Sequence, residues 1–141
     1  MGKPTEAAED IAPQTPLVLI IDDDAGLRYV LQEVFRHHGY TVATADSAEE
    51  AEQAKQRVGP KAISVVVVDV HLTPNPRFQE GYALYQQWTH LYPHLPFLLI
   101  SGVANSQHLP AIANGDVAFL AKPFTMESLL EEVKRLIKNP K

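Results

Sequence analysis

The sequence predicts an α/β domain in which five strands of a parallel sheet alternate with five helices that cover both faces, a doubly wound arrangement. From Leu17 onward, short apolar runs alternate with longer amphipathic stretches, which is the pattern of βαβ units. The run Ile63–Val68 is almost entirely Val and Ile, as expected for a central strand that helices cover on both faces. Folds of this class bind their ligands at the carboxyl ends of the strands.

The apolar runs give the predicted strands. Each run has the length of a strand and is bounded by polar or turn-forming residues. Parallel strands that are joined through helices take right-handed crossovers, so each strand should be followed by a helix that packs back on the sheet. The five runs are Leu17–Ile21, Thr41–Thr44, Ile63–Val68, Phe97–Ile100 and Val117–Leu120.

The stretches between the strands predict the helices. In the first stretch, apolar residues recur with the spacing of one helix face, at Leu27, Val30, Leu31, Val34 and Phe35. The other predicted helices are one that follows Ser47 and ends before Gly59, then Gly81–Leu91, a short Ser106–Asn114 and Met126–Lys138.

Local signals set several of these helix boundaries. Gly39 ends the first helix, and Ser47 with Glu50 predicts a capping box at the start of the second. Thr125 can cap the last helix. Pro110 lies inside the fourth helix, so we expect that helix to be short or deformed.

Composition excludes several classes of function. The chain has 141 residues, which suits one domain, and 45% of them are apolar, as in ordinary globular proteins. The formal charge of −5 lacks the basic excess that binds phosphate backbones, so direct nucleic-acid binding is not expected. The absence of cysteine excludes disulfides, thiolate nucleophiles and cysteine-bound zinc. No apolar run could span a bilayer and no signal-peptide pattern opens the chain, so we expect a soluble, cytoplasmic protein.

The two ends of the chain carry little that could pack in a core. Met1–Pro16 holds three prolines and several charged residues, and we expect it to be a disordered tail or linker. The folded domain is predicted over residues 17–139. Only three residues follow the last predicted helix, so no output domain is expected in this chain, which is either a stand-alone domain or part of a larger protein.

Polar residues follow the predicted strands where each strand ends. They are Asp22, Asp23 and Asp24 after the first strand, Asp69 after the third, Ser101 after the fourth and Lys122 after the fifth. Several carboxylates gathered at one edge repel one another unless a cation intervenes, and oxygen ligands of this kind suit Mg²⁺ or Mn²⁺. An aspartate beside that metal can attack a phosphoryl group, while a lysine neutralises charge on the group transferred.

Four motifs at these strand ends resemble the response-regulator receiver domain of two-component signalling, the CheY-like superfamily. As they stand in this chain, the motifs are LVLIIDDDAGLR, VVVVDVHL, FLLISG and AFLAKPF, in the order of the family. Together they span essentially the whole chain from Leu17 to Lys138. The resemblance implies a flavodoxin-like sheet with the strand order 2-1-3-4-5.

The resemblance also implies roles for individual residues. Asp69 is the phosphoacceptor, and Lys122 pairs with it once it is phosphorylated. Asp22 and Asp23 bind the metal ion together with Asp69 and the backbone carbonyl of His71.

Three further positions also match the family, and the resemblance implies roles for them. Ser101 holds a phosphoryl oxygen and acts in the switch. Phe119, three residues before the lysine, falls on the aromatic switch position of the family, where it has no hydroxyl group and can signal only through packing. Asp24 matches a position that often carries another acid.

Each assignment has an ordinary structural alternative. The three consecutive aspartates could cap the first helix, and Asp69 could be a turn residue. Lys122 taken alone is a solvated charge, Ser101 a loop hydroxyl and Phe119 a core residue. We favour the metal and phosphoacceptor roles because the four motifs occur together.

The segment after Asp69 departs from the family pattern. The interval from Asp69 to Gly81 is longer than usual, and Pro74 and Pro76 stiffen it, so the loop over the site is expected to be atypical. At His71 the simplest interpretation is a solvent-facing side chain of which only the backbone matters. We also hypothesise that His71 and Val103 change the rate of dephosphorylation.

The first functional hypothesis is a phosphorylation-dependent switch. A histidine kinase or histidine phosphotransfer protein donates a phosphoryl group to Asp69 with Mg²⁺, and the domain then changes a partner-binding surface on its fourth helix, fifth strand and fifth helix. Such a domain is not an enzyme in the usual sense, although it assists its own phosphorylation and its slow autodephosphorylation. Its partners are the kinase and a downstream protein or attached domain, a homodimer is left open, and no membrane is involved.

Two other classes are compatible with the fold. The first is a phosphorylation-independent interaction module with a pseudo-receiver fold, against which the presence of all the site residues argues. The second is a metal-dependent phosphohydrolase, for which no second catalytic acid or separate substrate pocket is evident.

Overall fold

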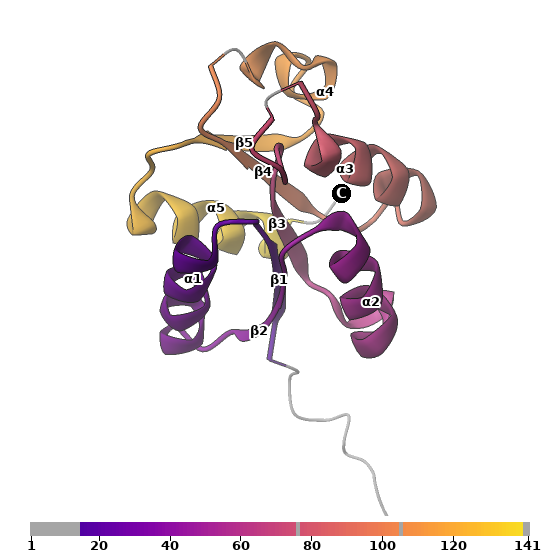
Figure 1. Cartoon of the computed structure of the whole chain (residues 1–141). Helices are drawn as coiled ribbons and strands as arrows, with labels where there is room; N and C mark the ends of the chain where they lie inside the picture. Colours follow the sequence, from indigo (N-terminus) through magenta and orange to yellow (C-terminus); the bar gives the residue numbers. More distant parts are fainter. Residues whose placement is uncertain (1–14, 76, 105, 140–141) are drawn as a thin grey trace, which may run out of the picture.

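The computed structural model describes residues 15–75, 77–104 and 106–139. Within them it contains a five-stranded parallel sheet with the order β2-β1-β3-β4-β5, which confirms the predicted fold class and strand order (Figure 1). The strands are β1 (Leu17–Ile21), β2 (Thr41–Ala45), β3 (Val65–Asp69), β4 (Phe97–Ser101) and β5 (Ala118–Ala121). The predicted tail Met1–Pro16 lies outside the described residues except for its last two.

Helices cover both faces of this sheet. In Figure 1, α1 and α5 lie on one face, α2 and α3 lie on the other, and the short α4 lies beside β5. The helices are α1 (Ala25–His37), α2 (Ala48–Val58), α3 (Glu80–Leu91), α4 (Pro110–Ala113) and α5 (Met126–Lys138), with 3₁₀ turns at Pro60–Ala62 and Ser106–His108. In the described part of the chain, none of the helices combines the length and apolar character that a bilayer span needs.

The sheet has two apolar cores because alternate side chains of each strand point to opposite faces. On one face, Phe35 of α1 and Leu129 of α5 are fully buried against the strands. On the other face, Trp88 of α3 is fully buried against strand residues and small residues of α2. Burial of such side chains contributes about 1.5–3 kcal/mol each. All five residues of β3 are buried, as predicted for the central strand.

Most of the predicted helix boundaries are confirmed. Gly39, just past α1, has a φ of 90°, a conformation that favours glycine. The Oγ atom of Ser47 accepts the N–H of Glu50 at 3.1 Å, and the Glu50 carboxylate accepts the N–H of Asp46 rather than that of Ser47. The Oγ1 atom of Thr125 caps α5 through the N–H three residues further on.

The predicted start of the third strand is wrong. The strand begins at Val65 rather than at Ile63, because the 3₁₀ turn Pro60–Ala62 carries the chain into the sheet. Ser64 is instead bound to the start of β1: its N–H donates to the carbonyl of Leu17 at 2.8 Å, and its Oγ accepts the N–H of Leu17 at 3.1 Å. Ile63 is still buried, which explains why the apolar run extends past the strand. The ends of the other strands differ from the predictions by at most one residue.

The fourth helical segment is deformed, as Pro110 predicts. Instead of one helix over Ser106–Asn114, the chain forms a 3₁₀ turn at Ser106–His108 and then the single-turn helix α4, which starts at Pro110. Proline lacks an N–H group and fits only the first turn of a helix, so the segment is divided at this residue.

The start of α3 packs directly on the end of β3. The N–H of Gly81 donates to the carbonyl of Val70 at 2.9 Å. A Cβ atom at position 81 would overlap the backbone carbonyl of Asp69. Gly81 is therefore required for the close approach of α3 to the strand end that carries Asp69.

Replacement of Gly81 by alanine is expected to lower the free energy of unfolding by about 1–3 kcal/mol or more, because the added methyl group meets backbone atoms that cannot move aside. Urea denaturation measures the change. The matched control is Gly26→Ala in α1, where the added Cβ would lie 3.4 Å from its nearest neighbour and stability is expected to stay the same or rise. Equal stabilities for the two variants would contradict the packing described here.

Candidate functional site

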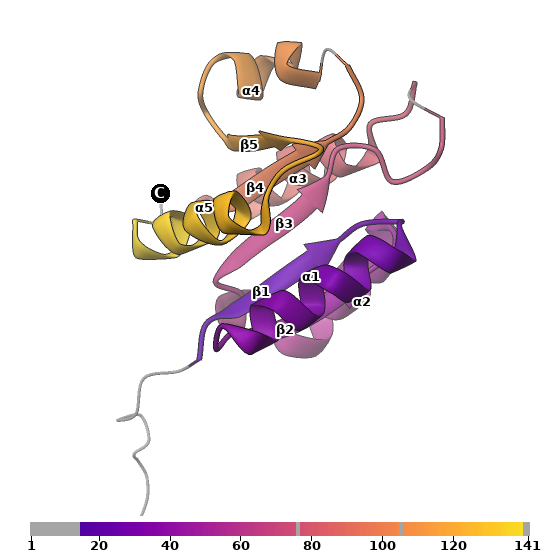
Figure 2. The same cartoon turned by 90° about the vertical axis from the view of Figure 1, so that its left-hand side faces the viewer.

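The candidate site lies at the edge of the sheet where the strands end. Figure 2 shows the strands running in one direction, with the connections to α1, α3 and α4 leaving from the same edge. Asp22 follows β1, Asp69 is the last residue of β3 and Ser101 is the last residue of β4. Lys122 follows β5 directly. The topology thus brings together residues from four separate strands.

Three carboxylates form a compact cluster at this edge. Each of Asp22, Asp23 and Asp69 offers an oxygen atom, and these atoms all lie within 4.8 Å of one another. Asp22 is fully buried and Asp69 is 5% exposed, whereas Asp23 is exposed to solvent. The cluster therefore has two carboxylates inside the protein and one at its mouth.

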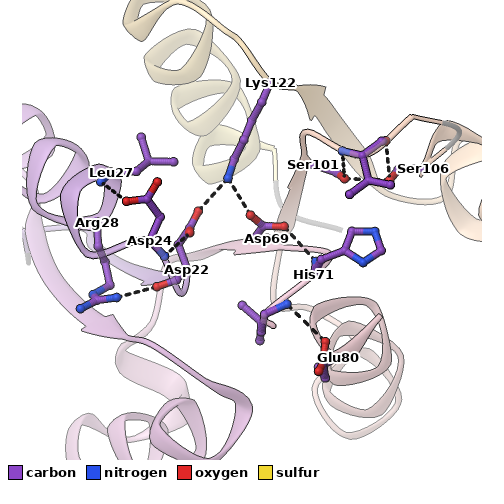
Figure 3. A network of polar contacts seen from close by, with 12 residues as sticks. Asp22, Asp24, Leu27, Arg28, Asp69, His71, Glu80, Ser101, Ser106 and Lys122 are labelled. Atoms are coloured by element: carbon purple, nitrogen blue, oxygen red, sulfur yellow. Dashed lines mark hydrogen bonds and ion pairs between the residues drawn. The ribbon is translucent and has the colours of Figure 1, made fainter. Parts of the chain in front are cut away.

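Lys122 lies between the two buried carboxylates. Its Nζ atom is 2.6 Å from Oδ2 of Asp69 and 3.2 Å from Oδ2 of Asp22. Dashed lines in Figure 3 mark both contacts. The side chain of Lys122 is 25% exposed, so water screens these ion pairs only in part. The lysine holds together two strand ends that are adjacent in the sheet.

The electrostatics of the cluster leave negative charge without full compensation. At a separation of 4.8 Å, two carboxylates repel by about 3–4 kcal/mol at an effective dielectric constant of about 20. Burial raises the pKa of Asp22, and the charge of Asp69 acts in the same direction, against the Asp24 N–H and Lys122, which lower it. Burial alone would lower the pKa of Lys122, but its hydrogen bonds and ion pairs with Asp69 and Asp22 raise it above the usual value.

Backbone groups orient the carboxylate of Asp69. The N–H of His71 donates to its Oδ1 atom at 2.8 Å, while Oδ2 accepts from Lys122. Because Gly81 packs against the carbonyl of Asp69, the residue is fixed at its backbone as well. Each oxygen of the Asp69 carboxylate therefore accepts one hydrogen bond.

Asp24 has a different place from its two neighbours. Its Oδ1 atom accepts the N–H of Leu27 at 3.1 Å, so Asp24 caps α1 as the structural alternative predicts. Its own N–H donates to Oδ1 of Asp22 at 2.9 Å. The backbone of Asp24 therefore orients the Asp22 carboxylate, and the side chain of Asp24 caps α1.

Arg28 is a site residue that the sequence did not indicate. Its Nη1 atom donates to the backbone carbonyl of Asp22 at 2.7 Å, which ties the first turn of α1 to the end of β1. The residue lies inside the LVLIIDDDAGLR motif, but a single arginine in a helix carries no signal that it will turn back to the preceding strand.

Ser101 lies at the expected edge but faces another hydroxyl group. It is 2% exposed, its Oγ is 2.7 Å from Oγ of Ser106, and it accepts the N–H of Val103 at 3.1 Å. In Figure 3 this group of residues lies beyond Asp69 as seen from Asp22. Ser106, which the sequence did not single out, is therefore part of the surroundings of the site.

Phe119 lies in β5, half-buried, with its side chain packed against the core that contains Trp88. The structure thus shows the contacts of an ordinary core residue at this position. A role in switching stays a prediction.

The side chain of His71 is buried, so the prediction that it faces solvent is wrong. The residue is only 8% exposed, and Nδ1 of its ring lies 2.9 Å from the backbone carbonyl of Phe78. Phe78, near the end of the connection between β3 and α3, therefore lies against the ring. The N–H of Leu72 also donates to the Glu80 carboxylate at 3.3 Å, so α3 holds the start of this connection; Pro76 lies outside the described residues.

A family model of the response regulator receiver domain matches residues 18–134. The chain belongs to this family. It is 31% identical over 121 residues to the C4-dicarboxylate transport transcriptional regulatory protein DctD of Rhizobium meliloti (strain 1021), an alignment that covers 85% of this chain and 25% of that protein. It is 30% identical over 138 residues to the sensor kinase CckA of Brucella abortus (strain 2308), covering 96% of this chain and 14% of that protein.

Solved receiver domains have the same fold. The non-phosphorylated HemR receiver domain from Leptospira biflexa superposes with a TM-score of 0.75 at 29% identity, covering 90% of this chain and 98% of that chain. A CheY-like receiver domain protein from Methanospirillum hungatei JF-1 gives a TM-score of 0.74 at 22% identity, with 89% and 95% of the two chains covered. The receiver domain spans a quarter or less of the lengths of DctD and CckA. Its fold is that of a signalling domain rather than of a classical enzyme.

The carboxylates of this receiver domain fit a divalent cation. Oxygen ligands from Asp22, Asp23 and Asp69 are the type that Mg²⁺ and Mn²⁺ prefer, and the exposed position of Asp23 leaves room for bound water. A cation would also reduce the repulsion that Lys122 compensates only in part.

Replacement of Asp23 by asparagine is expected to weaken Mg²⁺ binding by about tenfold or more, because affinity follows the number of charged ligands. Isothermal titration calorimetry measures the affinity. The matched control is Asp24→Asn, which should bind Mg²⁺ with nearly unchanged affinity because asparagine also caps helices. An equal loss of Mg²⁺ affinity in both variants would contradict the assignment of Asp23 to the cation and of Asp24 to the cap of α1.

Proposed function

We propose that this chain is the phosphoacceptor receiver domain of a two-component system or phosphorelay, and that Asp69 accepts the phosphoryl group. The observation that carries the proposal is the position of Asp69: its Oδ2 atom is 2.6 Å from Nζ of Lys122, and Asp22 and Asp23 offer oxygens within 4.8 Å of its own. A turn residue at the end of a strand would not need this surrounding of charges.

The reaction is the transfer of a phosphoryl group to a carboxylate. An oxygen of Asp69 attacks the phosphorus of a phosphohistidine, the bond between phosphorus and the imidazole nitrogen breaks, and that nitrogen keeps the electron pair. The product is an acyl phosphate on Asp69. The ammonium group of Lys122 neutralises charge on the phosphoryl oxygens, and the N–H of His71 keeps the carboxylate in place.

Asp22, Asp23 and Asp69 would hold a Mg²⁺ or Mn²⁺ ion, together with the backbone carbonyl of His71. When bound, such an ion supplies positive charge that stabilises the oxygens of the transferred group. Asp22 is the ligand that the protein positions most firmly, since Asp24 and Lys122 both donate to its carboxylate and Arg28 donates to its carbonyl.

The partners proposed for this domain are a histidine kinase or a histidine phosphotransfer protein, and a downstream protein or attached domain. Two relatives, a transcriptional regulatory protein and a sensor kinase, support the proposal of a receiver joined to other domains. The output surface is proposed to be formed by α4, β5 and α5, on which Phe119 would act through packing. The cytoplasmic location and the folded range 17–139 stay predictions.

Incubation with Mg²⁺ and acetyl phosphate, followed by intact mass measurement, tests the proposal. The protein is expected to gain one phosphoryl group, and Asp69→Asn is expected to gain none because the amide cannot form the acyl phosphate. Asp24→Asn serves as the control and should still be phosphorylated.

Two outcomes of this measurement would contradict the proposal. If no phosphoryl group is gained under conditions that saturate Mg²⁺ binding, the domain is an interaction module that does not use phosphorylation. If donor is consumed over many rapid turnovers, the site is that of a phosphohydrolase.

Replacement of His71 by asparagine is expected to speed the loss of the phosphoryl group severalfold. The buried ring of His71 contacts the carbonyl of Phe78, so we expect its loss to loosen the backbone next to Asp69 and to give water easier access to the acyl phosphate. The decay of phosphorylated protein, followed by intact mass, gives the rate. Val103→Asn, on the opposite connection, tests the same hypothesis independently, and equal decay rates for all three proteins would remove it.

A further inference from the structure

Two buried hydroxyl groups lie beside the proposed phosphoacceptor. Ser101 ends β4 and Ser106 opens the 3₁₀ turn that follows, and their Oγ atoms are 2.7 Å apart. They are 2% and 4% exposed, so water has little access to either. Figure 3 shows the two serines close together. The backbone N–H of Val103 donates to Oγ of Ser101, and the carbonyl of Val103 accepts from Oγ of Ser106.

The direction of these hydrogen bonds follows from counting protons. A hydroxyl group has one proton to donate, whereas a backbone carbonyl can only accept. The carbonyl of Val103 lies 3.0 Å from Oγ of Ser106, so Ser106 donates its proton there. Ser101 must then donate its proton to Oγ of Ser106, while its own oxygen accepts the N–H of Val103.

The proton of Ser101 is therefore already used within the loop. To donate to a phosphoryl oxygen on Asp69, Ser101 has to break its bond to Ser106. We propose that Ser106 is a positioning residue that keeps the hydroxyl of Ser101 in the unswitched orientation and so sets the free energy of switching. This inference rests on the proposed function of Asp69.

Ser106 is itself held in place by the backbone around it. Its N–H and its hydroxyl both contact the carbonyl of Val103, at 3.4 and 3.0 Å, and its carbonyl accepts the N–H of Leu109 at 3.0 Å. The next segment is α4, whose Ala111 N–H donates to the hydroxyl of Tyr82 in α3 at 2.9 Å. Release of Ser101 thus acts on a loop that leads directly into α4.

Replacement of Ser106 by alanine removes the acceptor that retains Ser101. A net hydrogen bond between neutral groups corresponds to about threefold to tenfold in an equilibrium constant. Ser106→Ala is therefore expected to bind beryllium fluoride, a mimic of the phosphoryl group, about threefold to tenfold more tightly at saturating Mg²⁺. Ser106→Thr keeps a hydroxyl group and should bind with nearly the wild-type affinity.

The experiment is a calorimetric titration of the full chain with beryllium fluoride, with each variant also made on a Ser101→Ala background. If Ser106 acts through Ser101, the Ser106→Ala substitution no longer increases the affinity for beryllium fluoride on the Ser101→Ala background. A purely structural role of Ser106 would change the melting temperature without this dependence on Ser101. Ser106→Cys keeps the shape of the side chain with a slightly larger atom that forms only weak hydrogen bonds, and it replaces Ser106→Ala if that variant does not fold.

The outcomes separate this inference from the function on which it rests. Wild-type affinity in Ser106→Ala, or an equal gain with and without the hydroxyl of Ser101, overturns the role of Ser106 while leaving Asp69 as the phosphoacceptor. Failure of the wild-type protein to bind beryllium fluoride overturns the proposed function and the role of Ser106 together.

Discussion

The repulsion between carboxylates at the ends of adjacent strands is the constraint on which the site depends. β1 and β3 are neighbours in the sheet, so Asp22 and Asp69 meet inside the protein, and Asp23 adds a third charge at the mouth. Lys122, which follows β5, forms ion pairs with both buried carboxylates. Since one ammonium group cannot balance three carboxylates, a cation bound at this edge of the sheet would lower the repulsion between them.

The fold places these charges through short backbone contacts around each strand end. Gly81 lets α3 lie directly on the carbonyl of Asp69, while Arg28 ties α1 to the carbonyl of Asp22. Both aspartates are thus fixed by a helix as well as by a strand. The hydrogen bonds of Ser101 and Ser106 are the ones in the site that can rearrange, because hydroxyl groups can exchange partners without a change in charge.

Much of the fold and of the site could be predicted from the sequence, because apolar periodicity and strand-end residues are local signals. The five strands and the convergence of the acids with Lys122 are of this kind, whereas the strand order followed from the resemblance to the receiver family. The start of β3 was missed because Ile63 is buried without being paired in the sheet, and burial alone gives the same apolar signal. The buried ring of His71, the contact of Arg28 and the bond between Ser101 and Ser106 depend on how loops fold back, which residue spacing does not encode.

A crystal structure of the chain with Mg²⁺ and beryllium fluoride would show whether these carboxylates form a single metal and phosphoryl site. We expect a metal ion between Asp22, Asp23 and Asp69, and beryllium bonded to an oxygen of Asp69 with a fluorine near Lys122. A structure in which both ligands bind elsewhere, with Lys122 still bridging Asp22 and Asp69, would contradict it.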